Sequence, residues 1–251
     1  FHHITLRRDS TAPVFSSVSP GTDSYINSAN IGYTISEDLA SGTITFTRTG
    51  GNASNNYTVN LAGSELNEGT HSNITLTNAP TLVSGAIYSI AFNGTDLAGN
   101  DASQVSVTGI TYDTTAPTIS GLAIASNNST NTLAKENDEV TLTITTNEVI
   151  STPSVTFTSG SASINDSSIT YAGSGTSWTA KYTVHSNDTD GAVAISVTVT
   201  DLSGNITTSS SITSGSVSVD TTVPSISAIT TSAFSWGSVL NATEDNSDGT
   251  V

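Results

Sequence analysis

The chain has 251 residues, a formal charge of −16 and neither Cys nor Met, and its Lys and Arg residues together number only five. A surface so poor in basic side chains has nothing to neutralise phosphates, which excludes nucleic acid as an expected partner and disfavours docking on anionic lipid. No run of about 18 apolar residues is present, so direct membrane insertion of this segment is not expected. Only 10% of residues are charged and the apolar residues alternate regularly, which indicates folded β domains rather than disorder.

The first part of the chain consists of short alternating segments. Apolar residues occupy every second position, Thr or Ser fill many of the others, and Gly, Asn and Asp separate the segments, a pattern typical of half-buried antiparallel strands. About seven strands in about 100 residues are the count and size of an immunoglobulin-like sandwich. The predicted strands are 13–18, 31–36, 42–49, 57–61, 73–77, 86–96 and 104–113.

The second part repeats this alternation, and no segment in either part has the periodicity of a helix. Its four clearest predicted strands are 139–145, 154–158, 178–184 and 193–200. Their apolar positions all fall on one face of each strand, so we expect them to form a core. The predicted core residues are Val140, Leu142, Ile144, Val155, Phe157, Trp178, Tyr182, Ile195 and Val197.

Two short motifs recur at the interval of one domain. DSTAP begins at Asp9, DTTAP at Asp113 and DTTVP at Asp220, at intervals of 104 and 107 residues. DLAGN begins at Asp96 and DLSGN at Asp201. A period of this length predicts a string of domains in which each unit contacts only its neighbours. We expect the last strand of a preceding repeat at 1–9, complete domains at 10–113 and 114–221, and the start of a third, incomplete repeat at 222–251.

The motifs DTTAP, WTAKYTV, DTDG and DLSGN resemble the tandem bacterial immunoglobulin-like repeats of large cell-surface proteins and adhesins. The resemblance covers essentially the whole chain and implies an all-β fold of immunoglobulin-like sandwiches arranged end to end, in an extracellular protein at the cell surface. Residues 10–113 lack the Trp strand and have a longer middle section, which implies another subfamily of the same sandwich. Such repeats serve many proteins as spacers, so the resemblance is far more specific for fold than for function.

Acidic residues are expected to gather at one pole of the first sandwich. In this fold the loops after strands two and six lie at the same end as the start of strand one. Asp9 precedes the first predicted strand, Glu37 and Asp38 follow the second, and Asp96 and Asn100 flank the turn after the sixth. Three segments far apart in the sequence therefore bring carboxylates to the pole that faces the preceding unit.

The same reasoning places Asp113, Glu148, Asp201 and Asn205 at the junction between the two domains. Like charges so close together repel one another unless a cation joins them. A hard cation with six to eight oxygen ligands suits Asp, Glu, Asn and backbone carbonyl groups. Calcium is therefore the leading candidate, and the resemblance to surface repeats also implies it. The Pro at a fixed offset from each recurring Asp would stiffen the chain between domains.

A plain structural interpretation of these motifs stays open beside the metal interpretation. Asp and Asn hydrogen-bond their own backbone and Gly supplies a positive φ, so DLxGN could be an ordinary turn and the Asp of DTTAP an ordinary cap. A third acidic group, Asp188 and Asp190 in DTDG, resembles half of an EF-hand loop but lacks its distal Glu. It is expected at the far pole of domain two, near Asp220, where it could serve the next junction.

No catalytic constellation is visible, so we expect no enzyme activity. Motifs such as HExxH, GxSxG and the P-loop are missing, and the four His residues have no ligand spacing. The leading hypothesis is a structural stalk or filament spacer of a large exported surface protein, whose partners are the neighbouring repeats of the same chain. The alternatives are a lattice or sheath component that contacts other copies of itself, and a carbohydrate-binding accessory module of an extracellular enzyme.

Overall fold

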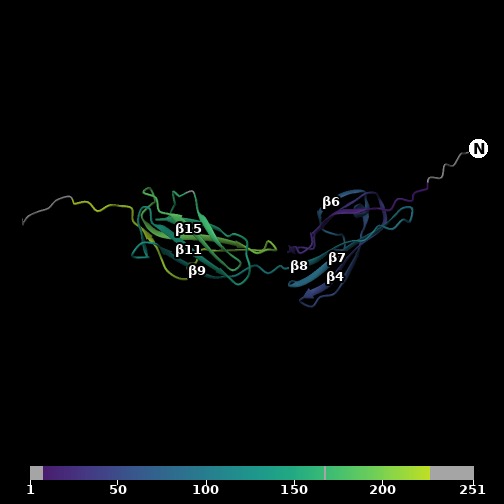
Figure 1. Ribbon diagram of the computed structural model, residues 1–251, viewed down its shortest axis with the longest axis horizontal. Helices are drawn as coiled ribbons and strands as arrows, with labels where there is room; N and C mark the ends of the chain where they lie inside the picture. Colours follow the sequence, from purple (N-terminus) through teal and green to yellow (C-terminus); the bar gives the residue numbers. More distant parts are fainter. Residues whose placement is uncertain (1–7, 167, 227–251) are drawn as a thin grey trace, which may run out of the picture.

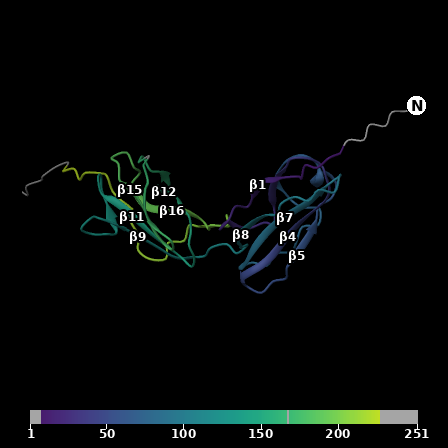
Figure 2. The same cartoon turned by 45° about the vertical axis from the view of Figure 1, so that its right-hand side comes forward.

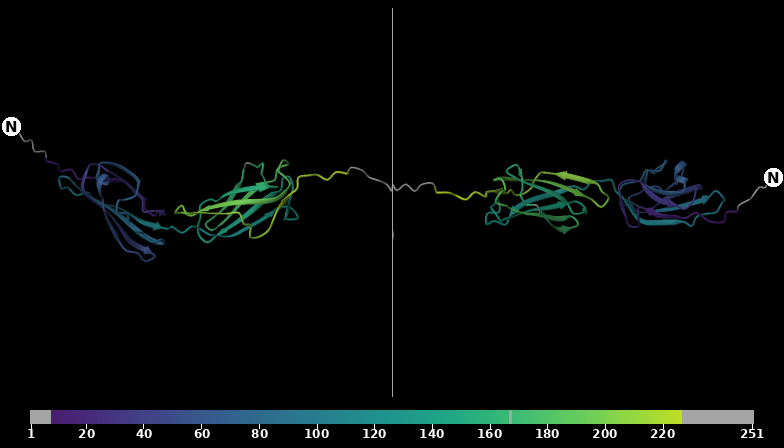
Figure 3. Two further views of the ribbon diagram at one scale, coloured as in Figure 1. Left: turned by 180° about the vertical axis from the view of Figure 1, so that it is seen from behind. Right: turned by 90° about the horizontal axis from the view of Figure 1, so that it is seen from above.

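The computed structural model describes residues 8–166 and 168–226, and these residues form two β-sandwiches. The sandwiches lie end to end and are joined by one crossing of the chain, as the views in Figure 1, Figure 2 and Figure 3 show. The predicted strand of a preceding repeat and the start of a third repeat lie largely outside the described residues. Within the described ranges, no helix is long and apolar enough to span a bilayer.

Domain 1 is a sandwich of a three-stranded and a five-stranded sheet, with strand orders β1-β3-β6 and β2-β8-β7-β4-β5. All pairs are antiparallel except β2 with β8. The chain crosses between the sheets at every connection except β4–β5 and β7–β8, which fits the Greek-key connections of an immunoglobulin-like sandwich. The elements are β1 (Phe15–Ser19), β2 (Tyr25–Ile26), β3 (Ile31–Ile35), β4 (Leu39–Gly51), β5 (Tyr57–Asn60), the short 3-10 helix η1 (Gly63–Leu66), β6 (Gly69–Ile74), β7 (Ala86–Asp96) and β8 (Val105–Tyr112).

Domain 2 repeats this plan with a four-stranded sheet, β14-β15-β11-β9, packed on a second sheet, β10-β18-β16-β12-β13. Strand β17 pairs with one end of β16 and β18 with the other, so they act together as one interrupted last strand. The elements are β9 (Ile119–Ser126), β10 (Leu133–Ala134), β11 (Glu139–Thr146), β12 (Ser154–Ser159), β13 (Ala162–Ser163), β14 (Thr170–Ser174), β15 (Ser177–Thr183), β16 (Gly191–Thr200), β17 (Ile206–Ser209) and β18 (Ser218–Val219). The prediction of an all-β, immunoglobulin-like fold is confirmed.

Each sandwich has its own core, built from the alternate residues that face inward. In domain 1 the rings of Phe15, Tyr33 and Phe92 pack against one another, with centroids 5.8 to 6.1 Å apart. In domain 2 Phe157 packs on Tyr182 at 4.8 Å. The two sets of buried residues have no member in common, so each domain buries its apolar surface independently of the other.

The predicted core of domain 2 is confirmed with one exception. The residues Val140, Leu142, Ile144, Val155, Phe157, Tyr182, Ile195 and Val197 are buried. The exception is Trp178, which packs against this core but is only partly buried. Its indole N–H donates to the Gly175 carbonyl oxygen at 3.3 Å, in the turn before β15, and this bond holds the ring at the end of the strand.

Candidate metal centres

One pole of each sandwich has a group of three carboxylates. In domain 1 the group is Asp9, Glu37 and Asp96, which each place a carboxylate oxygen within 4.8 Å of the other two. Asp9 precedes β1, Glu37 lies in the short loop between β3 and β4, and Asp96 ends β7. Asp96 is buried, whereas the other two residues are accessible, so the group is open to solvent on one side.

Domain 2 has the same arrangement at its junction with domain 1. Asp113, Glu148 and Asp201 bring carboxylate oxygens within 4.8 Å of one another, and Asp201 is the buried member. Asp113 directly follows β8 of domain 1, so this group takes ligand atoms from the linker as well as from domain 2. The structure thus brings together six of the residues that the sequence proposes as ligands, in two equivalent groups of three.

Local hydrogen bonds orient the Asp of each DTTAP-type motif. The carboxylate oxygen Oδ1 of Asp9 accepts the Thr11 N–H at 2.9 Å, and Oδ1 of Asp113 accepts the Thr115 N–H at 2.8 Å. Asp220 makes the equivalent bond with the N–H of Thr222 at 3.0 Å. These Asx turns explain why the motif needs Asp followed by small residues. In each case the second oxygen, Oδ2, is left free of this bond.

The DLxGN motif forms the turn that holds the buried Asp. The N–H groups of Ala98 and Asn100 both donate to Asp96 Oδ1 at 2.8 Å, and the Asn100 side-chain amide donates to Oδ2 at 2.7 Å. Gly99 has a φ of +89°, which favours Gly at this position. These bonds fix the orientation of the carboxylate, and the one from the Asn100 side chain contributes most to lowering the pKa of Asp96.

The Glu of each group has the opposite pKa shift. Partial desolvation, followed by the charges of Asp113 and Asp201, raises the pKa of Glu148 above its ordinary value. Desolvation and then the charges of Asp9 and Asp96 raise the pKa of Glu37 in the same direction. Each group therefore concentrates negative charge that nothing in the described residues neutralises, which is the electrostatic condition that favours binding of a cation.

Three other residues that the sequence proposes as ligands have different roles. Asp38 is not part of the domain 1 group, and its carboxylate accepts the N–H of Glu68 at 2.8 Å. The side-chain amide groups of Asn100 and Asn205 act as donors, to Asp96 and Asp201 and to carbonyl groups of the preceding linker. These amide groups therefore help to position the site, while coordination of a cation by either Asn would use the side-chain oxygen Oδ1 and stays a prediction.

The carboxylates of the DTDG segment accept hydrogen bonds from neighbouring loops. Asp188 is buried, and its oxygens accept N–H groups of Asn165 and His185 at 2.7 and 2.9 Å. Asp190 instead accepts both the N–H and the hydroxyl group of Thr221, at 2.7 and 2.9 Å. Asp188, Asp190 and Asp220 belong to none of the acidic groups found in the described residues. Their role in the next junction stays a prediction, beside the alternative that an Asp in a turn serves the backbone.

Sequence reasoning also missed the residues of domain 1 that hold the linker. Ser84, two residues before β7, donates its hydroxyl group to Asp113 Oδ1 at 3.0 Å and accepts the Thr114 N–H at 3.1 Å. Asp190 holds Thr221 and Thr222 from the corresponding place before β16. A Ser and an Asp share no obvious motif, and only the fold shows that they occupy equivalent positions.

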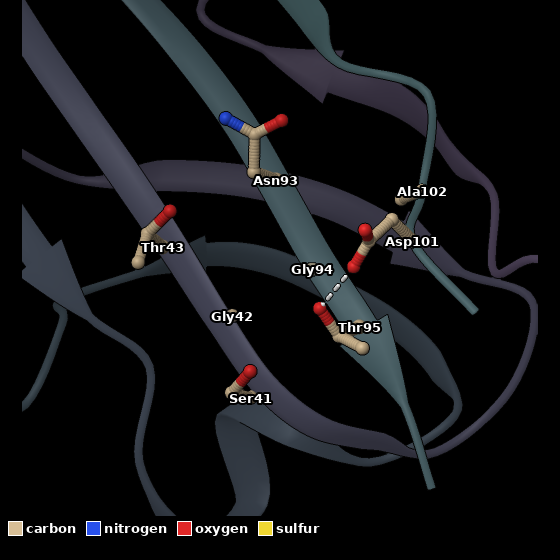
Figure 4. Close-up of a pocket in the computed structure, with 8 residues that line it drawn as sticks. All are labelled: Ser41, Gly42, Thr43, Asn93, Gly94, Thr95, Asp101 and Ala102. Atoms are coloured by element: carbon tan, nitrogen blue, oxygen red, sulfur yellow. Dashed lines mark hydrogen bonds between the residues drawn. The ribbon is translucent and has the colours of Figure 1, made fainter. Parts of the chain in front are cut away.

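A shallow groove of about 330 Å³ lies on the outer face of the five-stranded sheet of domain 1 (Figure 4). Thr95 donates to Asp101 at 2.7 Å at one side of it. Gly42 and Gly94 lie at its floor, and a Cβ atom on either would come within 2.6 or 2.8 Å of the buried side chains of Leu61 or Leu39. A side chain at either position would therefore force one of these Leu side chains to move. The lining residues are Ser41, Gly42, Thr43, Asn93, Gly94, Thr95, Asp101 and Ala102, and no aromatic ring lines the groove for a sugar to stack on.

No protein-family model and no curated protein sequence matches the chain. Among solved structures, it is similar to a chimeric titin Z1Z2 protein, with 13% identity over 83% of this chain and 97% of the other and a TM-score of 0.29. It is also similar to an I-band fragment of titin (14% identity, 84% and 64% covered, TM-score 0.35) and to a tetra-tandem repeat in the extending region of a large adhesion protein (19%, 83% and 49%, TM-score 0.25). Scores this low carry no conclusion about function, and the fold assignment depends on the strand topology.

Proposed function

We propose that this chain is a non-enzymatic spacer segment of a large exported surface protein or adhesin, located outside the cell, and that calcium ions stiffen its domain junctions. The observation that supports this proposal is the repetition of the same three-carboxylate group at the same pole of both sandwiches. A tandem of separate sandwiches supplies length. An ion that joins Asp113 of the linker to Glu148 and Asp201 of domain 2 would make the junction between the domains more rigid.

Calcium fits the available donors better than other common ions. Carboxylate oxygens are the ligands of hard cations, and calcium accepts six to eight of them in irregular geometry, whereas magnesium demands a near-ideal octahedron. Three carboxylates from separate segments, with backbone carbonyl groups nearby, supply part of such a shell. Desolvation and then repulsion from Asp113 and Asp201 raise the pKa of Glu148, and binding of a cation would relieve this repulsion.

Calcium titration of chelator-treated protein tests this proposal directly. Isothermal titration calorimetry is expected to show two sites with dissociation constants of about 10⁻⁴–10⁻³ M, the range of extracellular modules. A hundredfold excess of free calcium over the dissociation constant stabilises a folded domain by about 2.7 kcal/mol, so the melting temperature should rise. Small-angle scattering should show a narrower range of interdomain arrangements with calcium than with chelator.

Variants that each remove one carboxylate show which acidic group causes each calcium effect. Glu148→Gln and Asp96→Asn each remove one carboxylate from one group, so each should abolish one of the two sites. Only the Glu148 variant should change the scattering response, because only its group lies at the junction. Glu136→Gln removes the same charge from an exposed residue outside both groups and should change neither. Unaltered melting and scattering on addition of millimolar calcium would reject the ion sites.

Imaging separates the spacer from the lattice alternative. A spacer predicts isolated rods in negative-stain micrographs of concentrated protein, whether or not calcium is present. Ordered sheets or tubes would instead show that side-to-side contacts between copies carry the function.

A further inference from the structure

The last residue of the DLSGN motif, Asn205, lies where domain 2, the linker and domain 1 meet. We infer that Asn205 is a lock that narrows the range of angles between the two domains even without an ion. The hydrogen bonds that carry this inference involve protein atoms alone. It therefore does not depend on the proposed calcium sites.

The first two connections join Asn205 to its own turn and to the linker. Its backbone N–H donates to Asp201 Oδ1 and its side-chain Nδ2 to Oδ2, both at 2.8 Å, so both oxygens of the buried carboxylate are held by one residue. The same Nδ2 also donates to the carbonyl oxygen of Asp113 at 3.0 Å and lies 3.4 Å from that of Thr115. The linker backbone is thereby bound to the β16–β17 turn of domain 2.

The third connection reaches domain 1 directly. The Asn27 side chain, in the loop between β2 and β3, donates through Nδ2 to Asn205 Oδ1 at 3.4 Å. This loop is itself tied to the linker, because the carbonyl of Ile26 accepts the Asp113 N–H at 2.8 Å. Gly204 adopts a φ of +90°, and a Cβ at this position would lie 3.6 Å from Asn27 Nδ2. The distance is an ordinary van der Waals contact, so it is the positive φ, and not lack of space, that favours Gly at this position.

The equivalent residue of domain 1 shows which of these bonds belong to the motif and which to the junction. Asn100 donates to Asp96 at 2.7 Å and to the carbonyl oxygen of Thr11 at 3.1 Å, so it binds its own preceding linker in the same way. In both DLxGN turns of the described chain, the Asn side chain thus hydrogen-bonds both its own turn and the preceding linker. The bond from Asn27 is additional, and it links two folded domains.

The absence of Cys makes the test simple, because a pair of Cys residues can be introduced for spin labels. Thr108 in domain 1 and Thr156 in domain 2 are exposed and outside the junction, and both would be replaced by Cys. The distribution of distances between the two spin labels is then measured by pulsed electron–electron double resonance, with chelator present. In this background Asn205→Ala is expected to broaden the distribution relative to the unmodified junction.

Two further variants control this experiment. Asn100→Ala breaks the same bonds at the far pole of domain 1 and should leave the distribution unchanged. Asn27→Ala removes the direct bond between domains but leaves the Asp201 turn intact, so it should broaden the distribution less than Asn205→Ala. If Asn205→Ala fails to fold, the Asn27 variant decides the question. Distributions for the Asn205 and Asn27 variants that superimpose on that of the unmodified junction would overturn the lock. The calcium response of the unmodified junction, measured with the same labels, tests the ion sites separately.

Discussion

Tyr88 and Tyr182 are both fully buried, but their hydroxyl groups differ in hydrogen bonding. The Tyr88 hydroxyl group donates to Ser54 Oγ at 2.6 Å and accepts the Val83 N–H at 3.1 Å. The Tyr182 hydroxyl group is buried and has no partner among the described residues. Burial, and secondarily the charge of Asp188, raises the pKa of Tyr182, so its hydroxyl group stays protonated at physiological pH.

This difference predicts opposite results for the same substitution. Tyr182→Phe removes a polar group that is already unsatisfied, so the free energy of unfolding should stay unchanged or rise. Tyr88→Phe leaves the Val83 N–H without its acceptor and should cost about 1–3 kcal/mol. Urea unfolding of both variants measures the two values. A loss for Tyr182→Phe as large as that for Tyr88→Phe would mean that a buried water satisfies the Tyr182 hydroxyl group.

Glu148 makes the stability of domain 2 depend on pH in chelator. Its pKa is raised in the folded protein, above the ordinary Glu value of 4.5, so the folded state binds the proton more tightly than the unfolded state. Stability should therefore fall as the pH rises through this raised pKa. Glu148→Gln removes the unfavourable charge and should melt higher than the parent at pH 7, with the advantage shrinking as the pH falls towards 4.5. Melting curves of the two proteins between these pH values would contradict the expectation if their difference stayed constant.

At the scale of single elements, η1 depends on one buried carboxylate. Glu65 is largely buried, and its two oxygens accept the N–H groups of Ala62 and Thr77 at 2.8 and 2.6 Å. The Thr77 hydroxyl group donates to the same carboxylate at 2.8 Å. One side chain thus ties the segment after β5 to the segment after β6, and Tyr33 donates to the Glu65 carbonyl oxygen at 2.8 Å.

Replacement of Glu65 should therefore be costly. Glu65→Ala leaves two backbone N–H groups without acceptors in a partly buried site, at about 1–3 kcal/mol each. Glu68→Gln changes an exposed acid three residues along the chain and should be close to neutral. Thermal unfolding of domain 1 measures both. Equal melting temperatures for the two variants would show that water replaces the carboxylate in this connection.

The long strands could be predicted from the sequence, and the short ones could not. Predicted strand 86–96 has the same bounds as β7, because its alternation is regular and Gly or Asn marks both ends. Strand β9 was not predicted because Gly121, Ala123 and Ala125 alternate with Leu122 and Ile124, so neither face of the segment looks polar. Strands of two residues such as β10 are defined by a partner far along the chain, which a local pattern does not record. Predicted strand 73–77 is shifted to β6, since Asn73 has a positive φ and the chain bends there.

Across the whole molecule, the gathering of acids at the poles could be inferred from the sequence because it follows from the topology of the sandwich. The residues that turn these poles into a junction could not. Asn27 and Ser84 lie in loops with no recurring motif, and their contacts depend on how one domain meets the next. The role of Asn205 as a hydrogen-bond donor to the linker could not be inferred from the sequence either, because an Asn side chain can serve equally as a metal ligand or as a donor.

The junction consists of a few hydrogen bonds and the two cores are separate, so in chelator the domains should unfold independently. Phe92 is fully buried beside Phe15 and Tyr33, and Phe92→Ala should destabilise domain 1 by about 3–5 kcal/mol. The unfolding transition of domain 2 should stay in place, because distant changes in separate cores add without coupling. Differential scanning calorimetry resolves the two transitions. Phe157→Ala creates the matching cavity in domain 2 and should lower only the transition temperature of domain 2. A single transition that moves as a whole with either variant would show instead that the linker and the Asn205 contacts couple the two domains into one cooperative unit even without an ion.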